Sequence, residues 1–205
     1  MTSTSFSSVL LYFQTVDPIL YAAGTQITPI PTFEKRSNYF KELVDSIISQ
    51  HLSTKVAVVI SARVYALLPS GKLTPDAILQ LSTEDLRAVG VSYAKIRYMK
   101  DLAEKVSSKE LDLVELDQLS DAEVIEKLTV VKGIGQWTAE MFLMFALARE
   151  DVFSVGDLGL RRAVEKLYQL PSPPSKEVLM ETSAKWSPYR TWAARILWRS
   201  LDTAT

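Results

Sequence analysis

Residues 128–139 read Leu-Thr-Val-Val-Lys-Gly-Ile-Gly-Gln-Trp-Thr-Ala, and this stretch decides the fold. Gly133 and Gly135 separate two segments of helical periodicity. The first segment opens with Ser120-x-x-Glu123, a capping-box pattern, and the second runs from Gln136 to about Arg149. Because glycine adopts backbone conformations that other residues avoid, the pair predicts a tight turn between two helices. The second helix begins with N–H groups that lack intrahelical partners, and such a terminus binds phosphate without side-chain charge.

A Gly-x-Gly pair alone is more typical of one helix ending and another beginning. Three neighbouring features favour a phosphate-binding turn here. The turn is followed directly by Trp137-Thr138-Ala139, an acidic residue, Asp157, stands at the head of a later helix, and Arg161 and Arg162 lie one turn beyond that acid.

Most of the remaining chain has helical periodicity as well, and we predict an all-α fold of about ten helices. The stretch 26–32 has β-branched residues but contains Pro29 and Pro31, so an extended connector is expected there rather than a strand. A last helix is expected over 188–201. The expected helix caps are Ser37, Ser53 or Thr54, Thr74, Ser82, Ser92 and Ser120. The expected apolar faces are Phe40, Leu43, Val44, Ile47 and Ile48, followed by Val56, Val59, Ile60, Val64 and Leu67.

Composition narrows the classes of protein that the chain can belong to. It contains no cysteine, which excludes disulfides, Cys-ligated zinc and thiolate-bound iron–sulfur clusters. The formal net charge is -1 and the pI about 5.9, which counts mildly against nucleic-acid binding. Residues 156–205, however, hold eight lysines and arginines against five acidic residues, so one face can still be basic. The first residues lack the pattern of a secretory signal, and no apolar run is long enough to span a bilayer.

Five motifs in order resemble the helix-hairpin-helix DNA glycosylase superfamily, most closely its 3-methyladenine DNA glycosylase II branch. Together they cover most of the chain from about residue 36. In order, the motifs are Ile47-Ile48-Ser49-Gln50-His51-Leu52-Ser53, Leu86-Arg87-Ala88-Val89-Gly90 with Lys95, the glycine turn, 151–162, and Trp186-Ser187-Pro188-Tyr189-Arg190 to Leu197-Trp198. The resemblance implies two helical lobes with a cleft between them. We expect residues 36–138 to form the central lobe, and residues 1–35 with 139–205 to form the second.

The resemblance also implies the chemistry. Asp157 matches the catalytic carboxylate that stabilises an oxocarbenium-like sugar while the glycosidic bond breaks. Its other interpretation is a simple helix cap, and the two roles are compatible. Trp137 and Trp198 match the aromatic walls that hold a flipped, electron-poor alkylated purine, although a buried core position is equally typical of tryptophan. Bifunctional relatives carry a nucleophilic lysine where this chain has Trp137, so we expect a monofunctional enzyme.

The remaining site residues follow from the same resemblance. The backbone of the DNA is expected to contact Lys132, Gly133, Ile134, Gly135 and Thr138. The loop Gln50-His51-Leu52-Ser53 is expected to fill the gap left by the flipped base, and the short Ser53 makes a weak plug. No cofactor is expected to be required. A structural sodium or potassium ion is expected at the carbonyls of Thr129, Val131 and Ile134, whereas the single histidine, His51, excludes a histidine-based zinc site.

The sequence therefore predicts a monomeric DNA repair enzyme that excises alkylated purines of the 3-methyladenine and 7-methylguanine type from double-stranded DNA. We expect it inside the cell at DNA, in the nucleus or the nucleoid, with no membrane partner. Two alternatives stay open: a non-catalytic binder of abasic or alkylated DNA on the same scaffold, and a helical protein-interaction module.

Overall fold

The computed structural model describes residues 4–68 and 71–202. These residues form twelve α-helices and one short 3-10 helix, and they contain no strand. The all-α prediction is confirmed, and the segment 26–32 is not a strand, as expected: it begins with the turn that ends α2 and continues without regular secondary structure. No helix within these residues is long and apolar enough to cross a lipid bilayer. The chain divides into two compact units, which are described separately below.

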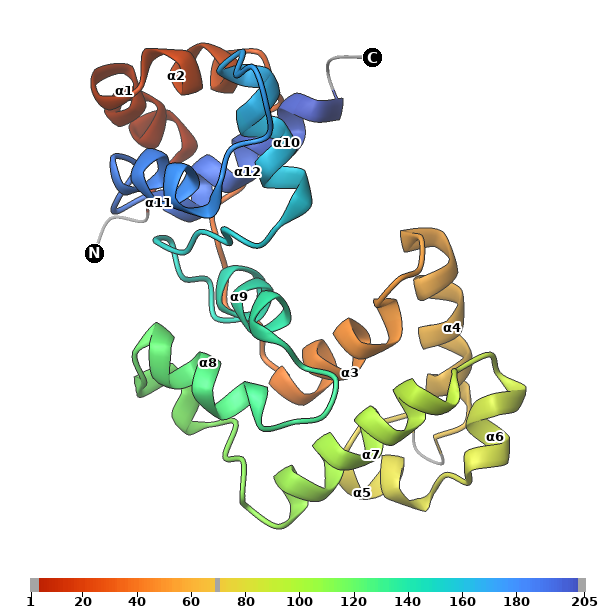
Figure 1. Ribbon diagram of the computed structural model, residues 1–205. Helices are drawn as coiled ribbons and strands as arrows, with labels where there is room; N and C mark the ends of the chain where they lie inside the picture. The colour runs from red at the N-terminus through yellow and green to blue at the C-terminus, as the bar shows by residue number, and fades with distance from the viewer. Residues whose placement is uncertain (1–3, 69–70, 203–205) are drawn as a thin grey trace. The chain divides into compact units, whose positions relative to one another are not determined.

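The first unit contains residues 1–35 and 143–205. Its helices are α1 (Phe6–Val16), α2 (Pro18–Thr25), α10 (Leu158–Leu167), α11 (Lys176–Ala184) and α12 (Arg190–Asp202). Helix α2 packs against α1, α10 and α12, so the two ends of the sequence share one core (Figure 1). Gly24 makes this packing possible, because a Cβ there would lie 2.4 Å from Leu10 Cδ2 and 3.3 Å from Ile196 Cδ1.

Two fully buried tryptophans, Trp186 and Trp192, form the centre of this core. The Trp192 ring stacks on Phe33 with 4.2 Å between the ring centroids. These two tryptophans are therefore core residues.

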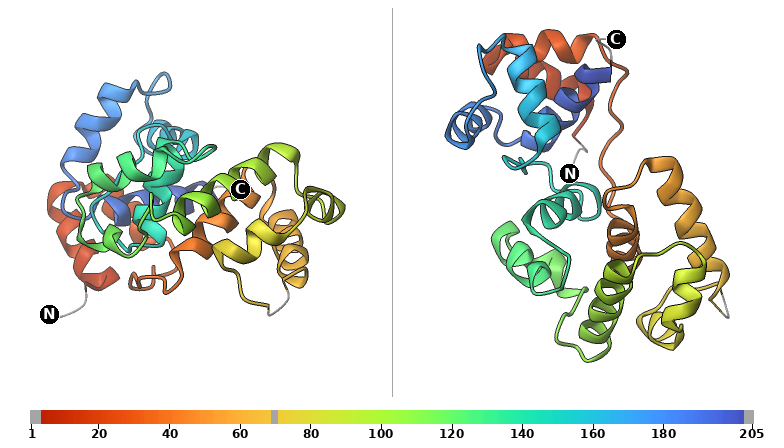
Figure 2. Two further views of the ribbon diagram at one scale, coloured as in Figure 1. Left: turned by 90° about the horizontal axis from the view of Figure 1, so that it is seen from below. Right: turned by 45° about the vertical axis from the view of Figure 1, so that its right-hand side comes forward.

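The second unit contains residues 36–142. Its elements are α3 (Tyr39–Ser49), α4 (Thr54–Ala66), α5 (Pro75–Gln80), α6 (Thr83–Ala88), α7 (Tyr93–Ser107), η1 (Glu115–Gln118), α8 (Asp121–Thr129) and α9 (Gln136–Phe145), whose last three residues belong to the first unit. Helix α7 is the longest and packs against α3, α5 and α6. Figure 2 shows α5 lying beside α7.

Side-chain caps at the helix starts explain why the helices begin where they do. A cap satisfies N–H groups that have no partner inside the helix. Ten helices begin with such a bond, from Ser5, Asp17, Asn38, Ser53, Thr74, Ser82, Ser92, Ser120, Asp157 and Ser175.

Two local predictions are wrong. The cap of α3 is Asn38, whose side chain accepts a hydrogen bond from Lys41 N, and not Ser37. The apolar face of α3 is buried as predicted, but that of α4 is only partly so: Val64 is buried as predicted, whereas Val56 and Val59 are 44% and 43% exposed and Ala57 is buried instead. Apolar residues surround the first turns of α4, so their periodicity could not select the inward face.

Candidate active site and DNA-binding elements

The turn between α8 and α9, residues 130–135, is the predicted hairpin. Gly133 has a φ of +82°, a conformation that side chains other than glycine rarely adopt. A Cβ at Gly133 would also lie 2.1 Å from Tyr98 Cδ2, so the turn rests directly on α7. Gly135 has no atom within 4 Å of its Cβ position, so this part of the turn faces open space. The turn thus combines a tightly packed glycine with an open one at the start of α9.

Asp101 on α7 binds the hairpin through Lys132. Its carboxylate accepts a hydrogen bond from the Lys132 backbone N–H at 2.9 Å and lies 3.0 Å from the Lys132 ammonium. Burial opposes ionisation of Asp101, but these contacts with Lys132 outweigh it and hold the pKa of the carboxyl below its usual range. The Lys132 side chain itself is 73% exposed. Asp101 was not identified from the sequence, because its partner is far away in the chain.

The predicted hairpin residues differ in exposure. Lys132, Gly133 and Gly135 are exposed, whereas Ile134 is 3% and Thr138 5% exposed. Ile134 and Thr138 therefore expose little surface to a ligand. Trp137, on the first turn of α9, is 47% exposed.

The predicted plug loop, residues 50–53, lies beside the hairpin in the same unit. The Gln50 side-chain amide donates a hydrogen bond to the Gly133 carbonyl at 2.8 Å. Lys95 holds the other side of the loop, because its ammonium donates to the carbonyls of Ile48 and Gln50 at 2.8 and 2.7 Å. Burial lowers the pKa of Lys95 below its ordinary value. Lys95 belongs to one of the five motifs, but the motif does not indicate its role as a C-terminal cap of α3.

The residues of the plug loop differ in exposure and in hydrogen bonding, and so in whether their side chains are available to contact DNA. Ser53 caps α4, where its hydroxyl oxygen accepts a hydrogen bond from Val56 N. His51 has a φ of +58° and is exposed, and Leu52 is 37% exposed. Positive φ is uncommon for residues other than glycine and often marks a functional loop.

Asp157 lies in the first unit at the start of α10 and is 9% exposed. Its Oδ1 accepts two hydrogen bonds, from Leu160 N at 2.7 Å and from the indole N–H of Trp198 at 3.0 Å. The cap predicted for this residue is present. The two donors come from α10 and α12, so the carboxylate is held by two packed helices.

Trp198 is half-buried and its ring stacks on Phe145, with 6.0 Å between centroids and 30° between planes. Gly159 makes the close approach of α12 possible. A Cβ there would lie 3.0 Å from Asp157 Oδ1 and 3.2 Å from Trp198 Nε1. Gly159 was missed in the sequence, where it stands as an unremarkable glycine inside a helix.

A metal site formed by side chains is not seen, since the part of the chain that the structure describes contains no group of three or more His, Cys, Asp or Glu residues suited to a metal ion. The three carbonyls proposed for a monovalent ion belong to Thr129, the last residue of α8, and to Val131 and Ile134 in the hairpin. The Val131 carbonyl already accepts a hydrogen bond from Ile134 N at 3.1 Å.

The comparisons with known proteins agree with this architecture. Residues 44–188 match the family described as "HhH-GPD superfamily base excision DNA repair protein". A DNA-3-methyladenine glycosylase of Schizosaccharomyces pombe is 38% identical over 178 residues, which cover 86% of this chain and 78% of that protein. The chain belongs to the HhH-GPD superfamily of base excision DNA repair proteins.

Solved structures extend the match over almost the whole chain. A DNA-3-methyladenine glycosidase from Bacillus halodurans is 39% identical, has a TM-score of 0.85, and covers 99% of this chain and 94% of its own. A 3-methyladenine DNA glycosylase from Schizosaccharomyces pombe, solved in complex with abasic DNA, is 32% identical with a TM-score of 0.84 and covers 96% and 98%.

Proposed function

We propose that this protein is a monofunctional DNA glycosylase that removes alkylated purines, of the 3-methyladenine and 7-methylguanine type, from double-stranded DNA. The observation that carries the proposal is the carboxylate of Asp157, which two N–H donors on different helices hold in place at the start of α10. The likeness to DNA-3-methyladenine glycosylases over most of the chain supports the substrate class. The protein would act inside the cell, at DNA, as a single chain.

The proposed reaction breaks the bond between C1′ of the sugar and the glycosidic nitrogen of the flipped base. The bonding electrons leave with the base, which is already cationic when alkylated and so departs as a neutral purine. The Asp157 carboxylate stabilises the positive charge that develops on the sugar. A water molecule then adds to C1′, loses a proton, and leaves an abasic site.

The fixed orientation of Asp157 supports this role. Because Oδ1 accepts both N–H groups, rotation of the carboxylate would break one of them. A preorganised negative charge needs no rearrangement when the sugar becomes positive, which is the main source of electrostatic catalysis. In the proposal, Trp198 positions the carboxylate and, with Phe145, offers an aromatic surface to the base.

The neighbourhood of the hairpin supports a monofunctional reaction. Trp137 stands where bifunctional relatives have a nucleophilic lysine, and the lysine nearest to it in the sequence, Lys132, is ion-paired with Asp101. The ion pair with Asp101 therefore holds the Lys132 amine at the hairpin wall, and it does not offer a nucleophile in place of the lysine of bifunctional enzymes.

The gap left by the flipped base would be filled from the plug loop. Since the Ser53 hydroxyl caps α4, we propose that His51 and Leu52, the exposed neighbours, enter the base stack. A Leu52→Ala variant should then bind abasic DNA more weakly, while Ser53→Ala should mainly destabilise α4 by about 1 kcal/mol. Anisotropy titration with an abasic duplex and urea unfolding measure the two effects.

We also propose that the hairpin carbonyls of Thr129, Val131 and Ile134 bind a sodium or potassium ion. The C-terminal end of α8 supports this, because the carbonyls at a helix C-terminus carry partial negative charge and accept a cation. The ion would give the hairpin a positive centre beside the DNA phosphates. Replacing potassium chloride with tetramethylammonium chloride at equal ionic strength should then weaken DNA binding.

The function is tested by incubating methylated duplex DNA with the protein and measuring the bases released. We expect release of 3-methyladenine and 7-methylguanine, with no strand cleavage before alkali. An Asp157→Asn variant should lose at least about a hundredfold in single-turnover rate, because the charge is removed while asparagine still caps the helix. Absence of release by the wild-type chain, together with tight binding to abasic duplex, would instead identify a non-catalytic binder of damaged DNA.

A further inference from the structure

A cavity of about 270 Å³ lies in the second unit beside the hairpin. Its walls come mostly from the exposed side of α7, with Thr83 of α6 on one side and Lys132 of the hairpin on the other. Pockets for small organic ligands are usually larger than about 300 Å³ and mostly apolar. This cavity is smaller and is lined mainly by charged side chains, so an ionic occupant fits it better.

The charges around the cavity leave an excess of positive charge. Arg97 and Lys100 line it and form no ion pair with another described residue. Of the two acids at its wall, Asp101 is paired with Lys132, and the other, Glu104, is exposed. Two unpaired cations beside one exposed carboxylate make a site for an anion.

An exposed aromatic ring completes the cavity. Tyr93, at the first position of α7, is 60% exposed, and the Arg87 guanidinium lies 4.6 Å from its ring centroid. The Arg87 guanidinium is itself held in place, because it donates a hydrogen bond to the Val91 carbonyl at 2.8 Å. Cations interleaved with exposed aromatic rings are typical of surfaces that follow a nucleic-acid backbone.

The cavity is continuous with the hairpin. Lys132 belongs to both, and the hairpin rests on α7 through Asp101 and through the contact of Gly133 with Tyr98. A DNA strand held by the hairpin therefore has the cations of α7 within the same rigid unit. Resting on the function proposed above, we infer that Arg97 and Lys100 bind backbone phosphates of the same duplex and extend the DNA-binding surface from the hairpin along α7.

The test compares variants in α7 with a control just beyond the C-terminal end of that helix. The Arg97→Gln and Lys100→Gln double variant removes the two proposed phosphate contacts. Lys109→Gln is the matched control, because Lys109 is exposed, forms no ion pair among the described residues, and follows the C-terminal end of α7, whose last residue lies about 15 Å from Arg97 along the helix axis. Binding to a short duplex with a tetrahydrofuran abasic site is measured by anisotropy at several potassium chloride concentrations.

Each phosphate contact contributes about 0.9 to the slope of log K against log salt, so the double variant should lower this slope by roughly 1 to 2 and weaken binding about tenfold at ~0.1 M salt. The control should bind like the wild type. In single-turnover excision, the double variant should need a higher protein concentration than the wild type to reach half of its maximal rate, whereas Lys109→Gln should need the wild-type concentration. Thermal melting checks that the exposed substitutions leave the fold intact.

The outcomes separate this inference from the proposed function. If the wild type excises methylated bases but the double variant keeps the wild-type affinity and slope, the proposed phosphate contacts of Arg97 and Lys100 are ruled out and the proposed function stands. If the double variant loses affinity while the wild type releases no base, the DNA-binding surface on α7 is supported and the proposed glycosylase activity is ruled out. A loss equal to that of Lys109→Gln, or no DNA binding by the wild type, contradicts the inference.

Discussion

Two carboxylates of the first unit have nearly the same local structure and differ in what surrounds them. Asp17 caps α2 through Leu20 N at 3.1 Å and accepts the indole N–H of Trp186 at 2.8 Å. Asp157 caps α10 through Leu160 N and accepts the indole N–H of Trp198. Each is therefore a helix cap that is also held by a tryptophan.

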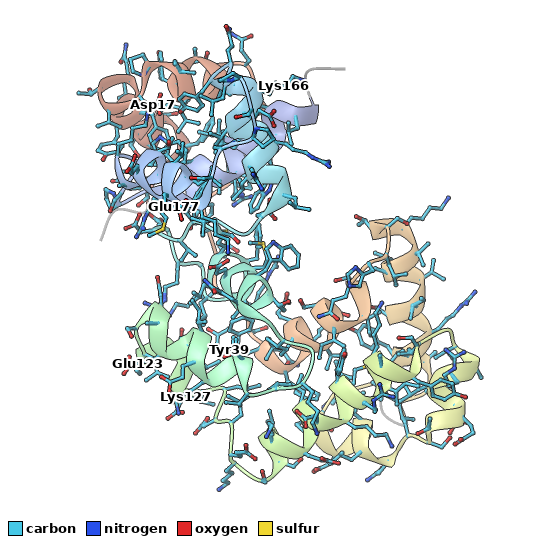
Figure 3. The ribbon with its side chains drawn as sticks, viewed as in Figure 1. Asp17, Tyr39, Glu123, Lys127, Lys166 and Glu177 are labelled. Carbon is cyan, nitrogen blue, oxygen red and sulfur yellow. The ribbon has the colours of Figure 1, made fainter. Side chains whose placement is uncertain are left out.

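The difference lies in the further partners. Asp17 also accepts a hydrogen bond from the Tyr168 hydroxyl and lies 2.8 Å from the Lys185 ammonium, and it is 2% exposed. Figure 3 labels Asp17 among the side chains of the first unit. The backbone N–H of Leu160 and the indole N–H of Trp198, which bind Asp157 Oδ1, are both neutral donors. Burial opposes ionisation of Asp17, but Lys185, Tyr168 and Trp186 outweigh it and hold the pKa of Asp17 below its usual range. The ion pair with Lys185 fits a structural role for Asp17, whereas the Leu160 and Trp198 N–H groups orient the carboxylate of Asp157.

Replacing Asp17 or Asp157 with asparagine should give the largest difference between the structural role of Asp17 and the proposed catalytic role of Asp157. Asp17→Asn removes the charge facing Lys185 and places an amide N–H₂ against existing donors, so we expect a loss of about 2–4 kcal/mol in the free energy of unfolding. Asp157→Asn should cost less than about 1 kcal/mol, because asparagine is a good helix cap. Urea unfolding measures both, and equal stability of the two variants would contradict the distinction.

The two tryptophans should show the same division with a smaller effect. Trp198→Phe removes the donor that orients Asp157 and should lower the excision rate roughly tenfold with little change in stability. Trp186→Phe removes the corresponding donor to Asp17 inside the core and should cost roughly 2 kcal/mol of stability, with the excision rate per folded molecule unchanged. The comparison fails if both variants change rate and stability in parallel.

A single methyl group tests the geometry at Asp157. Gly159→Ala brings a Cβ to 3.0 Å from Asp157 Oδ1, so either the carboxylate or Trp198 must shift by a few tenths of an ångström. We expect a loss of roughly three- to tenfold in excision rate, because such misplacement slows a preorganised site. Gly156→Ala is the control, since its Cβ position has open space around it, and it should retain the wild-type rate.

Acid should weaken the Asp17 cluster. A carboxyl with a lowered pKa in the folded state stabilises the protein above its unfolded pKa of about 3.9, and this contribution is lost as the pH falls toward the folded pKa. The wild type should therefore lose stability below about pH 4 more steeply than Asp17→Asn. Urea unfolding at a series of pH values measures this, and parallel curves would rule out Asp17 as the source.

Sequence reasoning identified the elements whose causes are local. The caps at Ser53, Thr74, Ser82, Ser92 and Ser120 and the buried face of α3 need only a side chain and its near neighbours. The start of α2 carried an equally local signal, Asp17 followed by Pro18, that was not used. Helix α1, with two serines as its capping box, has a weaker signature.

The parts of the site that were missed depend on contacts distant in sequence. Asp101 meets Lys132 across 31 positions, and Lys95 meets Ile48 across 47. Gly159 matters only because Trp198 packs against it from another helix. No pattern within one segment indicates such pairs, whereas the position of Asp157 at a helix start was visible locally.

The bond between the Gln50 amide and the Gly133 carbonyl fastens the loop that is proposed to enter the base stack to the turn that is proposed to grip the strand. Lys95, clamped under the same loop, leaves it little freedom to move independently. Binding of the strand by the hairpin and insertion of the plug loop would then occur together. As the protein slides along DNA, the plug loop would press against each base-pair step, and only a weakened base pair would open.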